Sequence, residues 1–375
     1  MKKILLSIAF LGIFAVNVAA QNPADSTNNA VSDFLSQVIQ EQNSNAYNRS
    51  GWTVGFVNTM RDSFNGAQIG FLNTITDNAR GGQVGFINTV AGSFNGSQVA
   101  FLNTATNDTK GAQVGFLNTV RGGFDGAQVG FLNTTTNDTK GAQVGFVNTI
   151  RGGLNGGQVG FVNTATSNVD GTQIAFINTA TSDIDGAQIG FVNIARKLNG
   201  WQLGFVNFAD EIENGVPVGF LSIVRRGGYR AVELSVSEFY LMNVGFKTGV
   251  ERFYTTFSVG YNPFAEQNSN RFAAGLGIGT IIPMGDSFFF NPEMTGLTSW
   301  GKNNKSLTSF VPYFGYNFCD RFSITAAPSI TYAHRWGHSP RNADSLEPIF
   351  SLANFKIDDR NEFVVGARMS VRWRL

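Results

Sequence analysis

Residues 113–118 read Gln-Val-Gly-Phe-Leu-Asn, and close copies of this hexapeptide return every fifteen residues through almost half of the chain. Thr53 begins the series, Gln202 arrives one residue early and Pro217 closes it, which makes twelve copies with the two degenerate ends counted. A fixed period is typical of repeat architectures, in which each unit buries its apolar face by stacking on its neighbours. We therefore expect residues 51–224 to supply length and surface rather than a catalytic pocket.

Two amide side chains keep fixed places in the regular copies. They are Gln68, Gln83, Gln98, Gln113, Gln128, Gln143, Gln158, Gln173 and Gln188, with Asn73, Asn88, Asn103, Asn118, Asn133, Asn148, Asn163, Asn178 and Asn193. Stacked amides hydrogen-bond along a stack, which explains their presence where apolar residues would otherwise do. We expect a structural Gln ladder and Asn ladder, together with a stack of Phe rings.

Each copy also has the composition of a β-strand. Strict alternation would place Val114, Phe116 and Asn118 on one side of the strand and Gln113 and Leu117 on the other. Aromatic and β-branched residues favour a strand, and Gly-rich turns end it. The glycine in the middle of the copy indicates close approach by another backbone or by an aromatic ring.

The turns between copies alternate in kind. One class carries an aromatic residue, as at Phe64, Phe94 and Phe124, and the other is polar, as at residues 107–110 and 137–140. The alternation predicts a thirty-residue unit made of two strands with two different ends.

Two all-β folds satisfy this pattern. In a β-solenoid, successive coils stack in parallel and like residues align. In an antiparallel meander, the two turn classes lie at opposite edges of one sheet, which could continue into a single large barrel. The invariant spacing favours the solenoid, because a coil of different length breaks every ladder whereas hairpin loops tolerate changes of length.

The N-terminus has the pattern of a secretory signal. Lys2 and Lys3 precede an apolar run at residues 4–16, and small residues at 18–20 supply a cleavage site, so residues 1–20 are predicted to be a signal peptide. The next segment, residues 21–50, is a polar linker. A short capping helix for the first repeat could form in it, since apolar residues recur at helical spacing at Val31, Phe34, Leu35, Val38 and Ile39.

Charge and cysteine content exclude several classes of function. Removal of Lys2 and Lys3 leaves 25 basic residues (27 − 2) against 26 acidic ones, a net charge of −1, which gives no reason to expect nucleic acid as a partner. The lone Cys319 excludes an intramolecular disulfide framework and a cysteine metal cluster. The Asp-Gly turns at Asp170 and Asp185 lack the Gly-Gly-x-Gly-x-Asp calcium pattern, so we expect no metal or other cofactor.

From Tyr229 onward, the pattern changes to strict strand alternation with aromatic ends. One side of each segment suits hydrocarbon and the other is small, polar or charged, which is typical of a transmembrane barrel with a polar interior. Residues 229–375 are therefore predicted to form an outer-membrane barrel of approximately eight strands, near 229–237, 239–248, 250–262, 271–283, 286–299, 307–319, 321–335 and 362–375.

An eight-stranded barrel is filled by its own side chains and is not a pore. The charged residues expected inside are Glu233, Lys247, Arg252, Arg271, Glu293, Arg368 and Arg372. We expect a salt-bridged plug in which Glu233 and Glu293 partner some of the bases. The alternative is an anion path, and an excess of base could mark a site for anionic headgroups near a rim.

The repeats, with Gly before each copy and Thr or Ala after it, resemble the surface-repeat proteins of spirochaetes and of the Bacteroidetes group. In that family, a Gly-x-Gln-x-Gly-x-x-Asn unit recurs in a secreted chain, and the resemblance covers about residues 51–224. It implies a surface location and no catalytic residues. Residues 229–375 resemble small outer-membrane barrels by their pattern.

The first of three functional hypotheses is a non-enzymatic outer-membrane protein whose repeats act as a spacer, an adhesive surface or an envelope-binding module. Its partners would be outer-membrane lipid and an envelope or host surface component. Barrel topology favours periplasmic repeats, whereas the resemblance favours surface exposure, so both sides of the membrane stay open.

The second hypothesis is a lipid-modifying barrel enzyme, whose only candidate residues are His334, His338, Ser339 and Glu347. Their spacing gives no assurance that a base reaches the nucleophile, so we do not expect an enzyme. The third hypothesis joins the repeats and the last strands in one barrel of about twenty strands that could hold a channel. Asparagines facing lipid would argue against it.

Overall fold

The computed structural model describes residues 50–265, 271–299, 305–336 and 347–375, so the predicted signal peptide and nearly all of the linker with its capping helix lie outside it. Within these ranges every regular element is a strand, and the all-β prediction is confirmed. None of the described residues belongs to a helix long and apolar enough to cross a membrane. The described residues form two compact units, divided between Phe146 and Val147.

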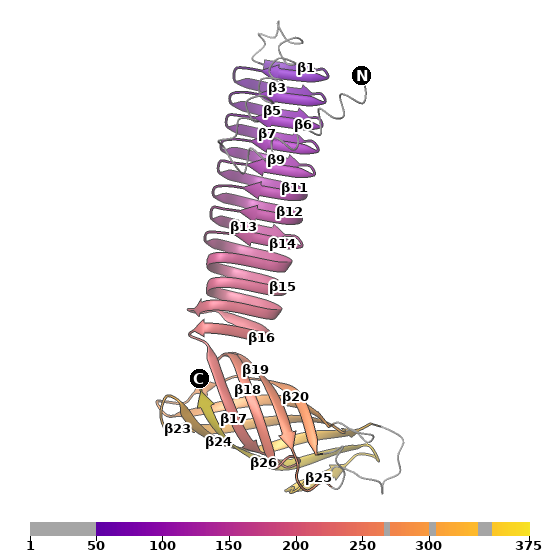
Figure 1. Cartoon of the computed structure of the whole chain (residues 1–375), viewed down its shortest axis with the longest axis vertical. Helices are drawn as coiled ribbons and strands as arrows, with labels where there is room; N and C mark the ends of the chain where they lie inside the picture. The colour runs from indigo at the N-terminus through magenta and orange to yellow at the C-terminus, as the bar shows by residue number, and fades with distance from the viewer. Residues whose placement is uncertain (1–49, 266–270, 300–304, 337–346) are drawn as a thin grey trace, which may run out of the picture. The chain divides into compact units, whose positions relative to one another are not determined.

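The first unit consists of stacked coils, each with two short strands joined by a corner (Figure 1). Its strands are β1 (Ser50–Val54), β2 (Val57–Met60), β3 (Phe64–Ile69), β4 (Leu72–Ile75), β5 (Ala79–Val84), β6 (Ile87–Val90), β7 (Phe94–Val99), β8 (Leu102–Ala105), β9 (Thr109–Val114), β10 (Leu117–Val120), β11 (Phe124–Thr135) and the first part of β12 (Thr139–Ile150). Each strand pairs in parallel with the equivalent strand one coil away, as Gln68 with Gln83 and Asn73 with Asn88.

The parallel pairing confirms the β-solenoid, with about 12 turns over residues 50–226, and shows that the meander is wrong. The large-barrel hypothesis is wrong for the same reason, because the repeats close on themselves as coils. The thirty-residue unit is also wrong, since equivalent residues in neighbouring coils are fifteen positions apart.

The alternation that suggested thirty residues arises in the core. Phe64, Phe94 and Phe124 lie inside the coils, and the coils between them place Ala79 and Thr109 at the same position. A large side chain therefore sits above a small one, which fills the interior without overpacking. Facing this column is a second one formed by Met60, Ile75, Val90, Ala105 and Val120.

The predicted sides of the repeat strand are partly wrong. Gln113 and Asn118 are both buried, whereas Val114 and Phe116 are both exposed. The strand is interrupted after Val114, and β10 starts at Leu117, so the chain turns a corner between the two strands. The corner shifts the alternation by one residue and brings both amides inside.

A column of glycines permits this tight coil. Gly51, Gly66 and their equivalents up to Gly200 have φ between +118° and +155°, a region that favours glycine. A Cβ built on Gly111 would lie 2.0 Å from the carbonyl oxygen of Gly96 in the preceding coil. A second column contains Gly115, the glycine in the middle of the repeat, which was predicted to allow close approach of another backbone. This prediction is confirmed, because a Cβ on Gly115 would lie 2.0 Å from the carbonyl oxygen of Ala100.

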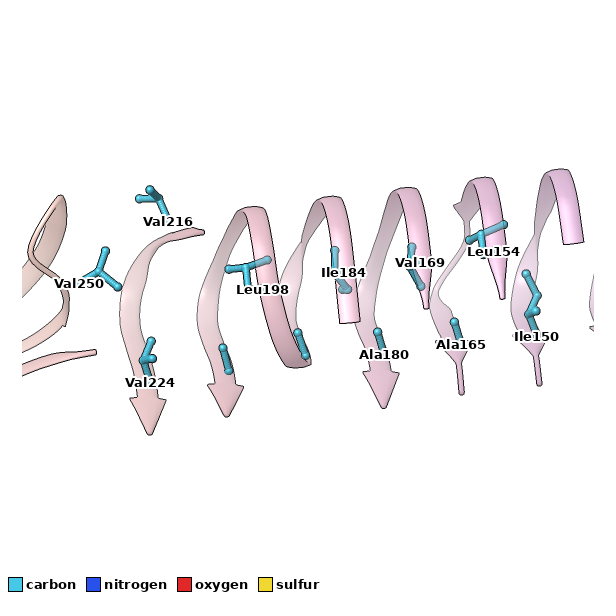
Figure 2. Close-up of a cluster of buried hydrophobic side chains, with 12 residues drawn as sticks. Ile150, Leu154, Ala165, Val169, Ala180, Ile184, Leu198, Val216, Val224 and Val250 are labelled. Atoms are coloured by element: carbon cyan, nitrogen blue, oxygen red, sulfur yellow. The ribbon is translucent and has the colours of Figure 1, made fainter. Parts of the chain in front are cut away.

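The second unit begins with coils of the same kind and ends in a barrel. Its coil strands are the rest of β12, β13 (Leu154–Val159), β14 (Val162–Ala165), β15 (Val169–Ile212) and β16 (Val216–Arg226). Figure 2 shows their core as two facing columns, one with Ile150, Ala165 and Ala180, the other with Leu154 and Val169.

The barrel has eight antiparallel strands and closes through pairing of its first and last strands. They are β17 (Tyr229–Val236), β18 (Met242–Val250), β19 (Phe253–Tyr261), β20 (Phe272–Gly279), β22 (Phe288–Ser299), β23 (Lys305–Asn317), β24 (Phe322–Arg335) and β26 (Asn361–Arg374), with short β21 (Ile282–Pro283) and β25 (Ala353–Lys356) beside them. The predicted strand number is confirmed.

The outer wall of the barrel closes the last coil. Thr248 of β18 donates a hydrogen bond from Oγ1 to the carbonyl of Ser222 (2.6 Å), and Thr255 of β19 donates one to the carbonyl of Gly219 (2.8 Å). Val250 joins the core of the coils (Figure 2). Because an unpaired edge strand is a template for aggregation, this contact protects one end of the solenoid.

Candidate functional site

The Asn ladder runs along the inside of the coils. In the first unit, each Asn from Asn58 to Asn118 donates from Nδ2 to Oδ1 of the next one, at 2.8–3.1 Å. In the second unit, the run from Asn148 continues to Asn207, which donates to Ser222 Oγ at 3.3 Å. Nδ2 also reaches a backbone carbonyl of the next coil, which fixes the amide orientation; Asn118 bonds to Val129 in this way at 2.9 Å.

The Gln ladder runs beside it in the opposite direction. Each Gln from Gln83 to Gln143 donates from Nε2 to Oε1 of the previous Gln at 2.7–2.8 Å, and Gln173, Gln188 and Gln202 do the same in the second unit. The two amide stacks therefore have opposed dipoles. Both predicted ladders are present, and the structure adds Asn58, Asn207 and Gln202 to them.

The Asn ladder should contribute strongly to stability. Replacing Asn118 with alanine leaves Asn103 Nδ2, Asn133 Oδ1 and the Val129 carbonyl without this partner in the buried interior of the coils. We expect a loss of about 2–4 kcal/mol in the free energy of unfolding. Thermal unfolding followed by circular dichroism measures it. Thr119→Ala, at the half-buried neighbouring position, is the control, and an equal loss in both variants would contradict a role for the ladder.

The barrel interior contains a buried ion-pair network centred on Glu233. Its carboxylate accepts a hydrogen bond from Arg372 Nε and from Ser370 Oγ (3.1 Å), and it lies 3.4 Å from Lys247 Nζ. Lys247 Nζ also lies 2.5 Å from Glu293 Oε2. The predicted salt-bridged plug is therefore present, with these two glutamates as partners of the bases.

The sequence analysis missed a second network, which lies midway along β24 and β26. Residues 237–241 connect β17 to β18 and turn inward, so Glu238 is fully buried. Its carboxylate pairs with Arg368 (3.3 Å) and accepts hydrogen bonds from Ser329 (3.0 Å) and Thr331. The expected one-residue connection concealed this group, and the pair Phe239-Tyr240 beside it was the only signal of burial.

Lys305 and Glu362 form a third interior pair, at 2.9 Å, which was also missed. Arg252, predicted to lie in the interior, is instead exposed in the turn between β18 and β19. Arg271 is half-buried just before β20, where its Nε donates to the Ala265 carbonyl and not to an interior acid. Both stand at strand ends, where the alternation of inward and outward residues stops.

The interior charges balance. Within the described barrel residues, buried acids and bases number four each: Glu233, Glu238, Glu293 and Glu362 against Lys247, Lys305, Arg368 and Arg372. No excess of base supports an anion path, and paired charges in a closed barrel instead stabilise each other against desolvation.

The enzyme candidates are only partly described. His338 and Ser339 lie outside the described residues, while Glu347 is exposed. The ring Nδ1 of His334 lies 2.8 Å from Asn361 Oδ1, and the ring packs edge-on against Trp336. The described part of the chain contains no group of three or more His, Cys, Asp or Glu residues suited to a metal ion.

The outer wall of the barrel is apolar. Side chains from all eight strands point outward and are exposed, among them Leu234, Val244, Val259, Leu276, Met294, Phe310, Ile324, Phe363 and Met369. A groove of about 650 Å³ crosses this wall over β17, β18, β23, β24 and β26, with Met242, Phe314 and Met369 among its lining residues. A wall of this kind, around an ion-paired interior, is the inverse of a water-soluble sandwich.

Comparison with known proteins finds no matching family model, no similar curated protein and no similar solved structure.

Proposed function

We propose that this chain is a non-enzymatic outer-membrane protein, in which the barrel anchors a β-solenoid that presents an extended surface within the cell envelope. The observation that carries the proposal is the exposed apolar wall of the closed barrel. In water, so large an apolar surface would favour aggregation, whereas in a bilayer it packs against the hydrocarbon chains of the lipid.

The filled interior supports an anchor rather than a channel. Buried ion pairs around Glu233 and Glu238 occupy the lumen at two levels, and the inward connection at residues 237–241 adds Phe239 and Tyr240. We expect the barrel to conduct no ions. Steady conductance in planar bilayers, at the single-channel level, would contradict this part of the proposal.

The contacts of the last coil favour a periplasmic position for the repeats. β16 contacts β18 and β19 close to the short turn at residues 251–252. In outer-membrane barrels, short turns face the periplasm and long loops face outward. The partner of the solenoid would then be an envelope component; a surface position would allow a host component instead.

Location can be tested in intact cells of a Gram-negative host. Sedimentation of the protein with outer-membrane markers supports the anchor, and its recovery in the soluble fraction overturns it. A protease-sensitive tag between coils, cleaved only after the outer membrane is opened, supports periplasmic repeats. Cleavage in intact cells would place them on the surface.

A charge on the outer wall should block insertion. Met369 lies midway along β26 and is 62% exposed, so Met369→Arg is expected to destabilise the inserted barrel by about 2–4 kcal/mol. The folded fraction after incubation with lipid vesicles measures this. Asn155→Arg is the matched control, because Asn155 is exposed on the outside of a coil and the next coil carries Asp170 at the same position. Equal insertion of both variants would mean that the wall does not face lipid.

A further inference from the structure

We infer that the solenoid binds a second copy of this chain, side by side and coil to coil, through an apolar stripe on its outer surface. The stripe comprises the Val, Ile or Leu that follows each ladder Gln (Thr53 in the first copy) and the Phe two residues later. In the first unit it runs from Val54 and Phe56 to Val144 and Phe146; in the second, from Val159 and Phe161 to Leu203 and Phe205.

The Phe rings of the stripe are stacked and ordered. Centroids of successive rings from Phe56 to Phe146 lie 4.9–5.1 Å apart, with interplanar angles of 8° or less. In the second unit, rings from Phe161 to Phe220 repeat the arrangement at 4.7–5.2 Å. The stripe is therefore a rigid ridge with a fixed axial repeat, and little side-chain entropy remains to be lost on binding.

The stripe is complementary to itself. Two ridges run along the stripe, one formed by Val129 and its equivalents and the other by Phe131 and its equivalents, with glycine or alanine between them in the regular copies. A two-fold axis parallel to the stripe sets the Val ridge of one copy against the Phe ridge of the other. Because both copies have the same axial repeat, the fit recurs at every coil, as in a dry zipper between sheets.

The area is sufficient for a stable dimer. Val129 and Phe131 are each 43% exposed. Complete burial of a Phe removes about 150–250 Å² from water, so the two side chains together offer about 150 Å² per coil. Six coils offer about 900 Å² per copy, above the roughly 800 Å² that each partner contributes to a standard interface.

A neighbouring outward column is unsuited to such pairing. It contains Arg80, Lys110, Asp125 and Lys140, and coil-to-coil contact would set each charge against its own copy. Like charges placed opposite each other are destabilising. The parallel orientation rests on the proposed function, since two barrels in one membrane bring their solenoids to the same side.

Cysteine cross-linking tests the arrangement in the full chain. Two differently tagged copies are co-expressed with Cys319→Ser, which removes the only cysteine. Val129→Cys in one copy should link to Phe131→Cys in the other through a short thiol-reactive cross-linker. The two-fold geometry brings these residues together within one coil, and packed sheet faces lie about 10 Å apart, beyond the roughly 7 Å between Cα atoms that a direct disulfide spans. Electrophoresis measures the heterodimer.

Two pairs serve as controls. Val129→Cys with Phe71→Cys is displaced by four coils, or about 19 Å, and Val129→Cys with Lys110→Cys leaves the stripe. We expect the same-coil pair to give at least about tenfold more heterodimer than either control, because only that pair is held at high effective concentration. Equal linking in the displaced pair would overturn the inference. Monomers in all three samples would also overturn it, and this is the result expected if lipid instead of a second copy covers the stripe.

Membrane sedimentation of the same samples separates the two proposals. Membrane-bound monomers would overturn the dimer and leave the anchor intact. Dimers recovered in the soluble fraction, apart from the membranes, would overturn the proposal that the barrel is a membrane anchor.

Discussion

Gly111→Ala is expected to open the solenoid at one coil and to reduce the free energy of unfolding by about 2–4 kcal/mol. Gly111 has φ of +123°, and an added Cβ would lie 2.0 Å from the carbonyl oxygen of Gly96. That oxygen belongs to backbone and cannot rotate away. Thermal unfolding by circular dichroism and limited proteolysis measure the effect, with new cleavage expected near residue 111.

Gly115→Ala is the matched control in the same coil. Its Cβ would also lie 2.0 Å from a backbone oxygen, that of Ala100. However, Ala100 and Ala175 already occupy this column, and φ at Gly115 does not lie in the region that strains an alanine. We expect a clearly smaller loss than for Gly111→Ala. Equal losses would mean that crowding alone, and not the positive φ, accounts for the glycine column.

Glu233→Ala is expected to destabilise the barrel by about 3–5 kcal/mol, because it leaves the buried cations Lys247 and Arg372 without this carboxylate. The shift from folded to unfolded mobility on heating in detergent measures it. Glu233→Gln keeps hydrogen bonding to Ser370 and should lose less. If neither variant folds, the yield of folded protein in a chemical rescue with added acetate still reports the missing carboxylate.

The control for this prediction is Glu251→Ala. Glu251 pairs with Arg374 at 2.8 Å, but both side chains are more than 40% exposed. An exposed pair of this kind contributes less than about 1 kcal/mol. Similar heat stability of Glu233→Ala and Glu251→Ala would contradict the view that the interior network holds the barrel together.

Much of the architecture could be predicted from the sequence, because a position that recurs in every copy shows which residue types the fold requires there. The fifteen-residue spacing of Gln113 and Asn118 predicted parallel coils with two amide ladders, and both are present. The barrel strands were predicted from the alternation of polar and apolar residues. This alternation persists along each strand because one face of the wall points into the polar interior and the other forms the apolar outer surface.

The errors arise where that alternation is interrupted. The corner after Val114 reverses which residues face inward, and no residue type announces such a reversal. Arg252 and Arg271 stand at strand ends, where direction is set by the turn. Glu238 was missed because its segment leaves the wall and enters the lumen, where Arg368, Ser329 and Thr331 partner the buried carboxylate.

The alternating core of the first unit has a consequence for how the coils find their partners during folding. Neighbouring coils are so alike that a coil could be skipped, with its fifteen residues looped out, and most ladder bonds would still form. Skipping one coil would place Phe94 directly on Phe64 instead of on Ala79, and two large side chains in place of a large and a small one are expected to overpack a core that already holds Ile75 and Val90. The alternation of large and small core residues thus disfavours a register in which one coil has been skipped. From Leu154 onward the column holds Val169, Ile184 and Leu198, so large and small residues no longer alternate and this selection against a skipped coil is lost.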